Sequence, residues 1–303
     1  MDKTMQRLTN FFETNDDLKV FAMNGSKLDK NIPDDKFKDF DVVFFTDCIE
    51  KYKKDRTFLN IFGEILLLTE PDGEGYVGKL TFPEKDGYIF LVQFENGIRI
   101  DMQFLQLKKL EEYLTEDSLT KIIGDKDARI KMDVVPNDSD YWQVKPKANE
   151  IEYSVKEFWW QFNNTLKATL RNEFLLAQFY LNLTREELFR LITWFLSFEH
   201  GFDKNYGKQN HKIIVLLSED VRKKIYKTFE TSSTEQLLVS LKAIGELELT
   251  FLVELYKYMD SDFMTKLIEL KSVPIKFLNS KGEGESAEYF KTAFESDSSF
   301  SNS

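Results

Sequence analysis

Residues 40–46, with the sequence FDVVFFT, constrain the fold of this chain more than any other stretch. The run is almost continuously apolar and rich in valine and phenylalanine, as in β-strands that are buried on both faces of a sheet. Asp39 and Asp41 stand where this run begins. Because a carboxylate is costly to bury unless its charge is compensated, the fold must provide such compensation at the start of the strand.

Further apolar runs predict strands at residues 18–23, 63–70, 88–94 and 97–105. Asn96-Gly97 separates the last two runs, and Asn-Gly between apolar runs is a strong signal for a β-hairpin. The spacing of apolar residues also predicts a helix at 4–15, and a charged helix is expected at 107–117. The N-terminal part of the chain is therefore expected to form a mixed α/β domain.

Three aspartates accompany these predicted strands. Side chains two residues apart on a strand lie about 6.5–7 Å apart on one face, so Asp39 and Asp41 form a pair. Asp101 lies on another predicted strand of the same sheet and can add a third carboxylate. Asp-x-Asp alone also occurs in loops, but beside a buried strand it favours Mg²⁺ ions that serve phosphoryl or nucleotidyl transfer. With 2 His and 1 Cys, the chain has few ligands for zinc, so a hard cation on oxygen ligands is expected.

A turn, Asn24-Gly25-Ser26, follows the predicted strand at 18–23. Asn-Gly can be a plain hairpin turn. Alternatively, the glycine lets backbone N–H groups approach a phosphate, with further donors from the Ser26 hydroxyl and the N-terminus of a following helix. The order of strand, Gly-Ser, Asp-x-Asp, strand and a later Asp resembles the signature of the polymerase-β-like nucleotidyltransferase superfamily.

The composition limits the partners of the chain. Its formal net charge of −11 argues against nucleic acid as a main partner, because phosphate backbones favour basic surfaces. The charge permits a cationic substrate, and it also serves solubility. No signal-peptide core and no apolar run of ~18 residues occur, so a cytoplasmic protein without a membrane span is expected. Cys48 has apolar neighbours and is interpreted as a buried structural thiol.

The second half of the chain is expected to be helical. Residues 131–150 hold two of the 6 prolines and little periodicity, which is typical of a linker. One helix is predicted from about residue 151 to 182. A second is predicted from Thr184, where Glu187 completes a capping box, to about Gly201.

A second capping box, with Ser232 and Glu235, predicts another helix that reaches about Met259. The last residues are rich in serine, glycine and glutamate, and they are interpreted as a loosely held tail. The expected division is a catalytic domain at 1–135, a linker at 136–150, a helical substrate-binding domain at 151–280 and a flexible tail at 281–303. The fold class is thus α+β, with a mixed sheet followed by a helical bundle.

The predicted helix from residue 151 carries two stripes at helical spacing. The polar stripe is either a solvated face or a face turned toward the catalytic domain across a cleft. In the second interpretation, Lys167 and Arg171 would meet the phosphates of a nucleotide, and Glu157 would orient or deprotonate a substrate. Trp159, Trp160 and Trp194 are interpreted as core residues. The polar stripe consists of Glu157, Gln161, Asn164, Lys167 and Arg171, and the apolar stripe of Phe158, Phe162, Leu166 and Leu170.

Several stretches together resemble the aminoglycoside 6-adenylyltransferases, which modify streptomycin. They are MNGS, IPDDKFKDFDVVFF, FGEILLL, NGIRIDMQFLQLKKLEEYL, DKDARI and EFWWQFNNTLKATLRNEFLLA, and the likeness spans about residues 1–285. The resemblance implies transfer of AMP from ATP to a hydroxyl of streptomycin with release of pyrophosphate. It also implies that Gly25 and Ser26 bind the triphosphate. Arg commonly follows Gly-Ser in this family, whereas Lys27 stands here and keeps the charge without the bidentate fork.

By the same resemblance, Asp39, Asp41 and Asp101 would hold Mg²⁺. Asp101 is the first candidate for the general base and Glu157 is the second. The expected partners are ATP and a polycationic aminoglycoside. Three alternatives stay open: an enzyme for another aminoglycoside or a lincosamide, a catalytically idle nucleotide- or drug-binding protein, and a nucleotidyltransferase acting on protein or RNA.

Overall fold

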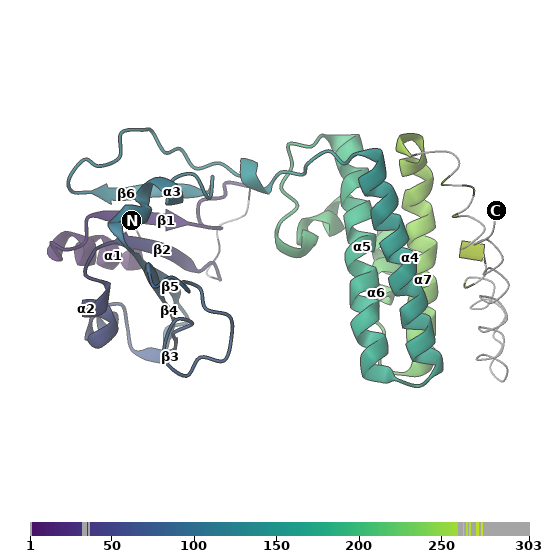
Figure 1. The fold of residues 1–303 in the computed structure, drawn as a ribbon, viewed down its shortest axis with the longest axis horizontal. Coiled ribbons are helices and arrows are strands. Elements are labelled where there is room, and N and C mark those ends of the chain that lie inside the picture. The colour runs from purple at the N-terminus through teal and green to yellow at the C-terminus, as the bar shows by residue number, and fades with distance from the viewer. Residues whose placement is uncertain are drawn as a thin grey trace. The chain divides into compact units, whose positions relative to one another are not determined.

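The computed structural model describes residues 2–31, 35, 37–259, 263, 265, 267, 271, 272 and 274 of the chain. The chain divides into two compact units, Met1–Asp140 and Tyr141–Ser303. The boundary falls inside the segment 136–150 that the sequence marks as a linker. Figure 1 shows the strands in the first unit and the long helices in the second, which confirms the α+β class.

The first unit is built on a six-stranded sheet with strand order β3-β4-β5-β2-β1-β6. Strands β2 and β5 are parallel, and every other neighbouring pair is antiparallel, so the sheet is mixed as predicted. The strands are β1 (Val20–Asn24), β2 (Phe40–Phe45), β3 (Ile65–Thr69), β4 (Gly87–Phe94), β5 (Arg99–Leu105) and β6 (Thr120–Asp125).

The central strand β2 is covered on both faces, as its apolar run predicts. Phe44 belongs to the larger core, where helix α1 (Lys3–Thr14) packs its Phe11 ring edge-on at 5.4 Å. Val43 and Phe45 belong to a smaller core on the opposite face. That second core is formed with the short helix α3 (Leu110–Tyr113). Asp41 alternates with Phe40 and Val42, so it lies on the face of this smaller core.

The predicted hairpin at Asn96-Gly97 is confirmed. Strands β4 and β5 pair antiparallel, and the Phe94 N–H donates to the Ile98 carbonyl at 2.9 Å. Gly97 has φ of +83°, the left-handed conformation that glycine adopts without strain. The helix expected at 107–117 is shorter than predicted, because a 3₁₀ turn at Leu107–Lys109 precedes α3. Helix α2 (Ile49–Lys54) and strand β6 were not predicted.

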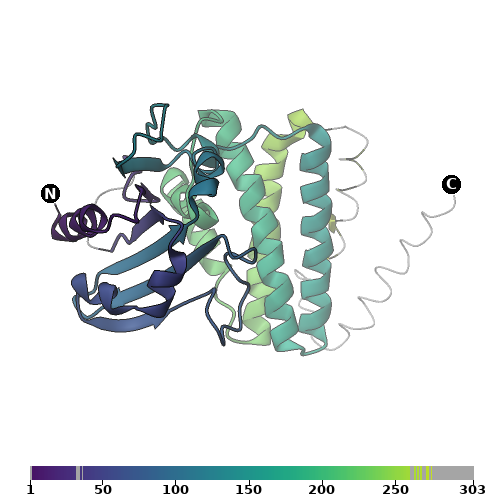
Figure 2. The same cartoon turned by 60° about the vertical axis from the view of Figure 1, so that its left-hand side comes forward.

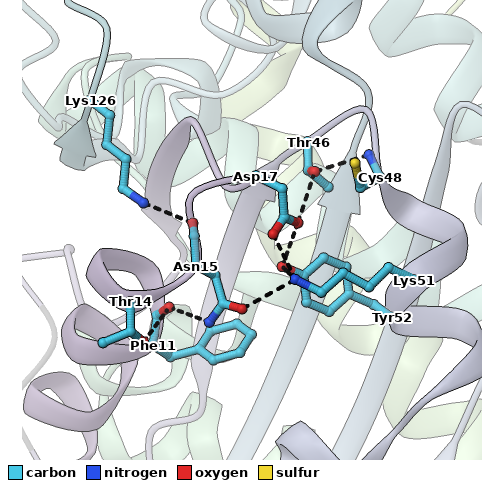
Figure 3. A network of polar contacts seen from close by, with 9 residues as sticks. All are labelled: Phe11, Thr14, Asn15, Asp17, Thr46, Cys48, Lys51, Tyr52 and Lys126. Atoms are coloured by element: carbon cyan, nitrogen blue, oxygen red, sulfur yellow. Dashed lines mark hydrogen bonds and ion pairs between the residues drawn. The ribbon is translucent and has the colours of Figure 1, made fainter.

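The interpretation of Cys48 as a buried thiol is wrong. Cys48 is exposed at the N-terminus of α2, and its backbone N–H donates to Thr46 Oγ1 at 3.0 Å. Figure 3 shows the polar network that surrounds it, in which Asp17 accepts hydrogen bonds from Lys51 Nζ at 2.6 Å and from the Tyr52 hydroxyl at 2.7 Å. The apolar neighbours of Cys48 in sequence belong to the strand, whereas Cys48 itself lies in the loop after it.

The second unit is a helical bundle. Helices α4, α5 and α7 run side by side in both views (Figures 1 and 2). Its core is mainly apolar and includes Phe158, Phe162, Leu188 and Leu241. The helices are α4 (Ala148–Leu170), α5 (Phe174–His200), α6 (Glu219–Lys227) and α7 (Thr234–Leu255). No helix in the described parts of the chain is long and apolar enough to cross a membrane.

The predicted boundary between the first two long helices is wrong. The chain breaks at residues 171–173, where Asn172 takes a left-handed φ of +60°, and α5 then continues through Thr184. Thr184 is buried, and its hydroxyl donates to the Tyr180 carbonyl at 2.9 Å inside the helix. Glu187 accepts a hydrogen bond from Ser154 Oγ at 2.6 Å instead of closing a capping box. A threonine hydroxyl can bond within a helix as well as cap one, which explains the error.

The remaining helix ends agree more closely with the sequence. Helix α5 ends at His200, and Gly201 follows with φ of +97°. Helix α7 begins one residue later than predicted, because Ser233 rather than Ser232 accepts the hydrogen bond from the Gln236 N–H. Helix α7 itself ends at Leu255, before a 3₁₀ turn at Tyr256–Tyr258. The predicted tail at 281–303 lies outside the described residues.

Candidate active site

The sheet brings two of the three predicted aspartates directly together. In the parallel pair β2–β5, Asp41 is the register partner of Asp101. In the antiparallel pair β1–β2, Asn24 is the register partner of Asp41. Because neighbouring strands lie about 4.8 Å apart and partners point to the same face, these three polar side chains line up across three strands. Asp39, two residues before Asp41, lies just ahead of β2.

An arginine that sequence reasoning missed completes this group. Arg99 Nε donates to Asp101 Oδ1 at 2.8 Å, and Arg99 Nη2 donates to Asp101 Oδ2 at 2.7 Å. Its third nitrogen, Nη1, lies 3.5 Å from Asp39 Oδ2. The signal was present in the sequence as Arg-Ile-Asp, because residues two apart on a strand share a face.

Asp41 lies in a site with excess negative charge. Burial, together with the neighbouring Asp101 and Asp39, raises the pKa of Asp41 to about 6, while Arg99 acts in the opposite direction. Among the described residues, none donates a hydrogen bond to Asp41. This carboxylate is therefore only partly compensated by its own chain.

Gly25 brings the backbone of the turn against Asp41. It has φ of +80°, and a Cβ atom at this position would overlap Asp41 Oδ2. Only glycine satisfies both the backbone conformation and this close approach. The Leu28 N–H donates to the Gly25 carbonyl at 3.0 Å, and the Asp29 N–H donates to the Ser26 carbonyl at 3.3 Å.

The expected helix after Ser26 is not found in the described residues up to Asn31, which form successive turns. The helix N-terminus that was expected to add phosphate donors is therefore absent from that stretch. Lys27, next in the chain, places its Nζ 4.1 Å from the centre of the Phe40 ring. A cation is attracted to the face of an aromatic ring in this way, and this contact holds the Lys27 side chain over Phe40, the first residue of β2.

Asn24, the residue before the turn, is held in place by hydrogen bonds with two neighbouring elements. Asn24 Nδ2 donates to Thr120 Oγ1 of β6 at 2.8 Å, and the Tyr113 hydroxyl of α3 donates to Asn24 Oδ1. Burial raises the pKa of Tyr113, so its hydroxyl keeps the proton that it donates. Sequence reasoning did not find this role of Asn24, because Tyr113 and Thr120 lie far away in the sequence.

The donor chemistry of the site suits a hard divalent cation. Among the described residues, no group of three or more His, Cys, Asp or Glu side chains is already arranged as a metal site, and Arg99 occupies both oxygens of Asp101. Carboxylate oxygens are nevertheless the ligands that Mg²⁺ prefers. The raised pKa of Asp41 reflects first its burial and then the negative charges of Asp101 and Asp39, and a bound cation would favour the ionised form. Asp39, Asp41 and Asp101 are the residues that would hold it.

The other predicted site residues all lie in the helical unit. Glu157 accepts a hydrogen bond from Gln161 Nε2 at 2.6 Å, and Gln161 Oε1 accepts one from Asn164 Nδ2 at 3.4 Å. Lys167 is half-buried in the last turn of α4, and Arg171 is exposed just after it. Hydrogen bonds therefore join the first three residues of the polar stripe, and Arg171 lies just beyond the end of the helix.

The three tryptophans differ in their environment. Trp159 is buried in the core of the bundle, as predicted, and Trp194 packs against that core from a partly buried position. The interpretation of Trp160 as a core residue is wrong, because its side chain is 68% exposed. At 100° per residue it falls on the same stripe as Glu157 and Asn164, which the sequence pattern could have indicated.

Comparison with known proteins identifies relatives that match most of the chain. The family model described as streptomycin adenylyltransferase matches residues 1–266. Proteins named aminoglycoside 6-adenylyltransferase are 34% identical in Staphylococcus aureus, over 76% of this chain and 81% of that protein, and 32% identical in Campylobacter jejuni, over 74% and 77%.

A third protein of the same name, from Bacillus subtilis, is 29% identical over 76% of this chain and 81% of its own length. Among solved structures, an aminoglycoside 6-adenyltransferase from Bacillus subtilis covers 90% of this chain and 97% of its own, with 21% identity and a TM-score of 0.41.

Proposed function

The chain belongs to the streptomycin adenylyltransferase family and is a nucleotidyltransferase of the aminoglycoside 6-adenylyltransferase type, and from that premise we propose that it transfers AMP from ATP to a hydroxyl group of streptomycin. Pyrophosphate is the second product. The family implies ATP and an aminoglycoside as substrates. The choice of streptomycin rests on the resemblance and on the name of the matching family, streptomycin adenylyltransferase.

One observation carries the proposal: Asp41 and Asp101 face each other on neighbouring strands beside the turn at Gly25. Transfer of a nucleotidyl group needs few covalent contributions from the protein, and it depends on binding the phosphates and neutralising their charge. A half-buried glycine turn next to a carboxylate cluster would provide both in one place. Gly25, Ser26 and Lys27 are assigned to the triphosphate.

Asp39, Asp41 and Asp101 are assigned to Mg²⁺. The ion, when bound, supplies positive charge that neutralises the triphosphate and polarises the phosphorus to be attacked. The chain's own residues then have distinct tasks. The Gly25 turn positions the phosphates, and the Asn24 contacts with Thr120 and Tyr113 keep that turn in place.

Two carboxylates are candidates for accepting the proton of the attacking hydroxyl. Both oxygens of Asp101 accept hydrogen bonds from Arg99, so each has one lone pair fewer with which to accept a proton. Glu157 accepts a single hydrogen bond through Oε1, from Gln161, among the described residues. Lys167 and Arg171 are assigned to nucleotide phosphates by their match to the family motif. The acidic net charge of −11 suits a polycationic substrate.

The assignment of the metal residues is tested by replacing each carboxylate with its neutral isostere. Asp41→Asn and Asp101→Asn should each lower the rate of pyrophosphate release with ATP, Mg²⁺ and streptomycin by roughly 1,000-fold, because stabilisation of transition-state charge is lost. Asp127→Asn is the matched control: Asp127 is a surface carboxylate that pairs with Arg129 at 2.8 Å in the same unit, and its variant should keep full activity. Near-normal turnover by Asp41→Asn would contradict the assignment.

The choice of streptomycin is tested separately with the unaltered protein. A panel of streptomycin, other aminoglycosides and a lincosamide, each with ATP and Mg²⁺, should give the highest kcat/KM for streptomycin. A higher value for another antibiotic would change the substrate and leave the reaction type standing. Absence of turnover with every compound would instead support a binding protein that lacks catalysis.

A further inference from the structure

Arg99 holds two of the three site carboxylates in the structure. Three of its nitrogen atoms are used: Nε and Nη2 bond both oxygens of Asp101, and Nη1 lies 3.5 Å from Asp39 Oδ2. The side chain is 43% exposed, so its guanidinium is anchored by these carboxylates and otherwise borders solvent. A guanidinium fork of this kind matches a carboxylate in geometry as well as in charge.

Arg99 pairs with two of the three carboxylates assigned to Mg²⁺, Asp101 and Asp39. A carboxylate oxygen that accepts an N–H has fewer free lone pairs for a metal ion, and two positive charges a few ångströms apart repel each other. Arg99 and a divalent cation are therefore alternative partners of Asp101 and Asp39. Arg99 can leave without breaking the strand, because only its backbone belongs to β5.

We propose that Arg99 is a built-in counter-ion of the carboxylate cluster, which occupies Asp101 and Asp39 in the metal-free protein and is displaced when a divalent cation binds. It is a positioning residue, and it lowers the affinity for the cation while keeping the carboxylates in place. The proposal rests on the proposed function in one respect, the assignment of the metal to these carboxylates. To that function it adds Arg99 as the residue that competes with the metal and that lowers the affinity for the cation.

The test measures metal binding directly rather than turnover. Mn²⁺ is titrated into the unaltered protein and into Arg99→Met by calorimetry, with and without a non-hydrolysable ATP analogue. Methionine keeps the length of the apolar stem and removes the charge and all donors. We expect Arg99→Met to bind Mn²⁺ roughly tenfold more tightly, since a competing charge is removed. Arg99→Lys keeps the charge without the fork and should lie between the two.

Thermal unfolding provides the second readout. Without metal, Arg99→Met should unfold at a lower temperature than the unaltered protein, because Asp39, Asp41 and Asp101 then repel each other without compensation. Mn²⁺ should raise the unfolding temperature of Arg99→Met more than that of the unaltered protein, since binding no longer displaces a partner. A purely structural salt bridge would give the first effect and not the second.

Arg56 offers a closely matched control within the same unit. Arg56 Nε donates to Glu70 Oε1 at 2.8 Å and Nη2 donates to Glu70 Oε2 at 2.8 Å, the same bidentate arrangement. The exposures also match, with 41% and 18% for Arg56 and Glu70 against 43% and 16% for Arg99 and Asp101. Arg56→Met should lower the unfolding temperature to a similar degree and leave Mn²⁺ affinity unchanged.

The outcomes separate this proposal from the one on which it rests. Equal Mn²⁺ affinity in Arg99→Met and the unaltered protein overturns the role of Arg99 and leaves the metal site standing. Weaker binding by Arg99→Met also overturns it, since the arginine would then support the site. If neither protein binds Mn²⁺ in any condition, both the metal assignment and this inference are wrong.

Discussion

The two units of this protein each place a carboxylate against an apolar core, and they compensate it differently. In the helical unit, Glu248 of α7 is fully buried and bonds Lys271 Nζ at 3.1 and 3.2 Å, while Trp159 Nε1 donates to it at 3.1 Å. In the sheet unit, Asp41 has no hydrogen-bond donor among the described residues, and its neighbours include two further carboxylates.

The difference separates a structural carboxylate from a functional one. Glu248 has its hydrogen-bond partners, Lys271 and Trp159, within the chain, so it requires no cation from outside. Asp41 is left partly compensated, with a pKa raised to about 6 by burial and by Asp101 and Asp39. A carboxylate whose charge is not satisfied internally is one that an external cation can stabilise. The comparison therefore supports the proposed cation site in the sheet unit, whereas the Glu248–Lys271 pair is satisfied within the bundle.

The strongest test of this comparison removes the partner of Glu248. Lys271→Met leaves a fully buried carboxylate without its cation, and this should lower the free energy of unfolding by about 3–5 kcal/mol, measured in urea. Burial raises the pKa of Glu248 and lowers the pKa of Lys271, so neither charge is retained easily alone. The double variant Glu248→Met with Lys271→Met should be close to neutral. Equal losses in the single and double variants would contradict the role of the pair.

A second test concerns the turn beside Asp41. Gly25→Ala adds a Cβ in a left-handed conformation and against Asp41 Oδ2, so it should cost about 2–3 kcal/mol of stability and reduce AMP transfer. Gly97→Ala is the control, because Gly97 has nearly the same φ, +83° against +80°, and no atom lies within 4 Å of its Cβ position. The control should lose only the backbone part, about 1 kcal/mol, and retain activity. A larger loss of stability in Gly97→Ala than in Gly25→Ala would show that the contact with Asp41 is unimportant.

The third test predicts a gain in stability. The folded pKa of Asp41, about 6, lies above the usual value for an unfolded chain, ~3.9. The folded state therefore binds the extra proton, and this stabilisation is lost as the pH rises through about 6.

Asp41→Asn has no carboxylate at this position, so it never carries the negative charge that Asp41 acquires as the pH rises. With allowance for solvent screening, it should be more stable than the unaltered protein by about 1–2 kcal/mol at pH 7.5, while losing activity. The gain should shrink toward zero below about pH 4, in urea unfolding without metal. Lower stability of Asp41→Asn at pH 7.5 would mean that the ionised carboxylate is satisfied in the folded state.

Much of the fold followed from local patterns. The apolar run at residues 40–46 and the Asn96-Gly97 turn depend on burial and backbone conformation within a few residues, and both are confirmed. The helix start at Thr184 was wrong because a threonine has two hydrogen-bonding choices that the sequence alone does not separate. The break at 171–173 was missed because Asn172 takes a left-handed conformation that apolar spacing does not reveal. Cys48 was misplaced because it directly follows a buried strand, which the pattern extends too far.

The sequence by itself determined which residues are candidates for the chemistry: a Gly-Ser turn, an Asp-x-Asp pair and a later aspartate, each recognisable from short-range spacing. Only the tertiary structure decided that Asp41 is the register partner of Asp101, that Gly25 touches Asp41, and that Arg99 lies among the carboxylates. The physical reason is that strand pairing joins residues sixty positions apart, and a shift of one residue would turn every side chain of a strand to its other face.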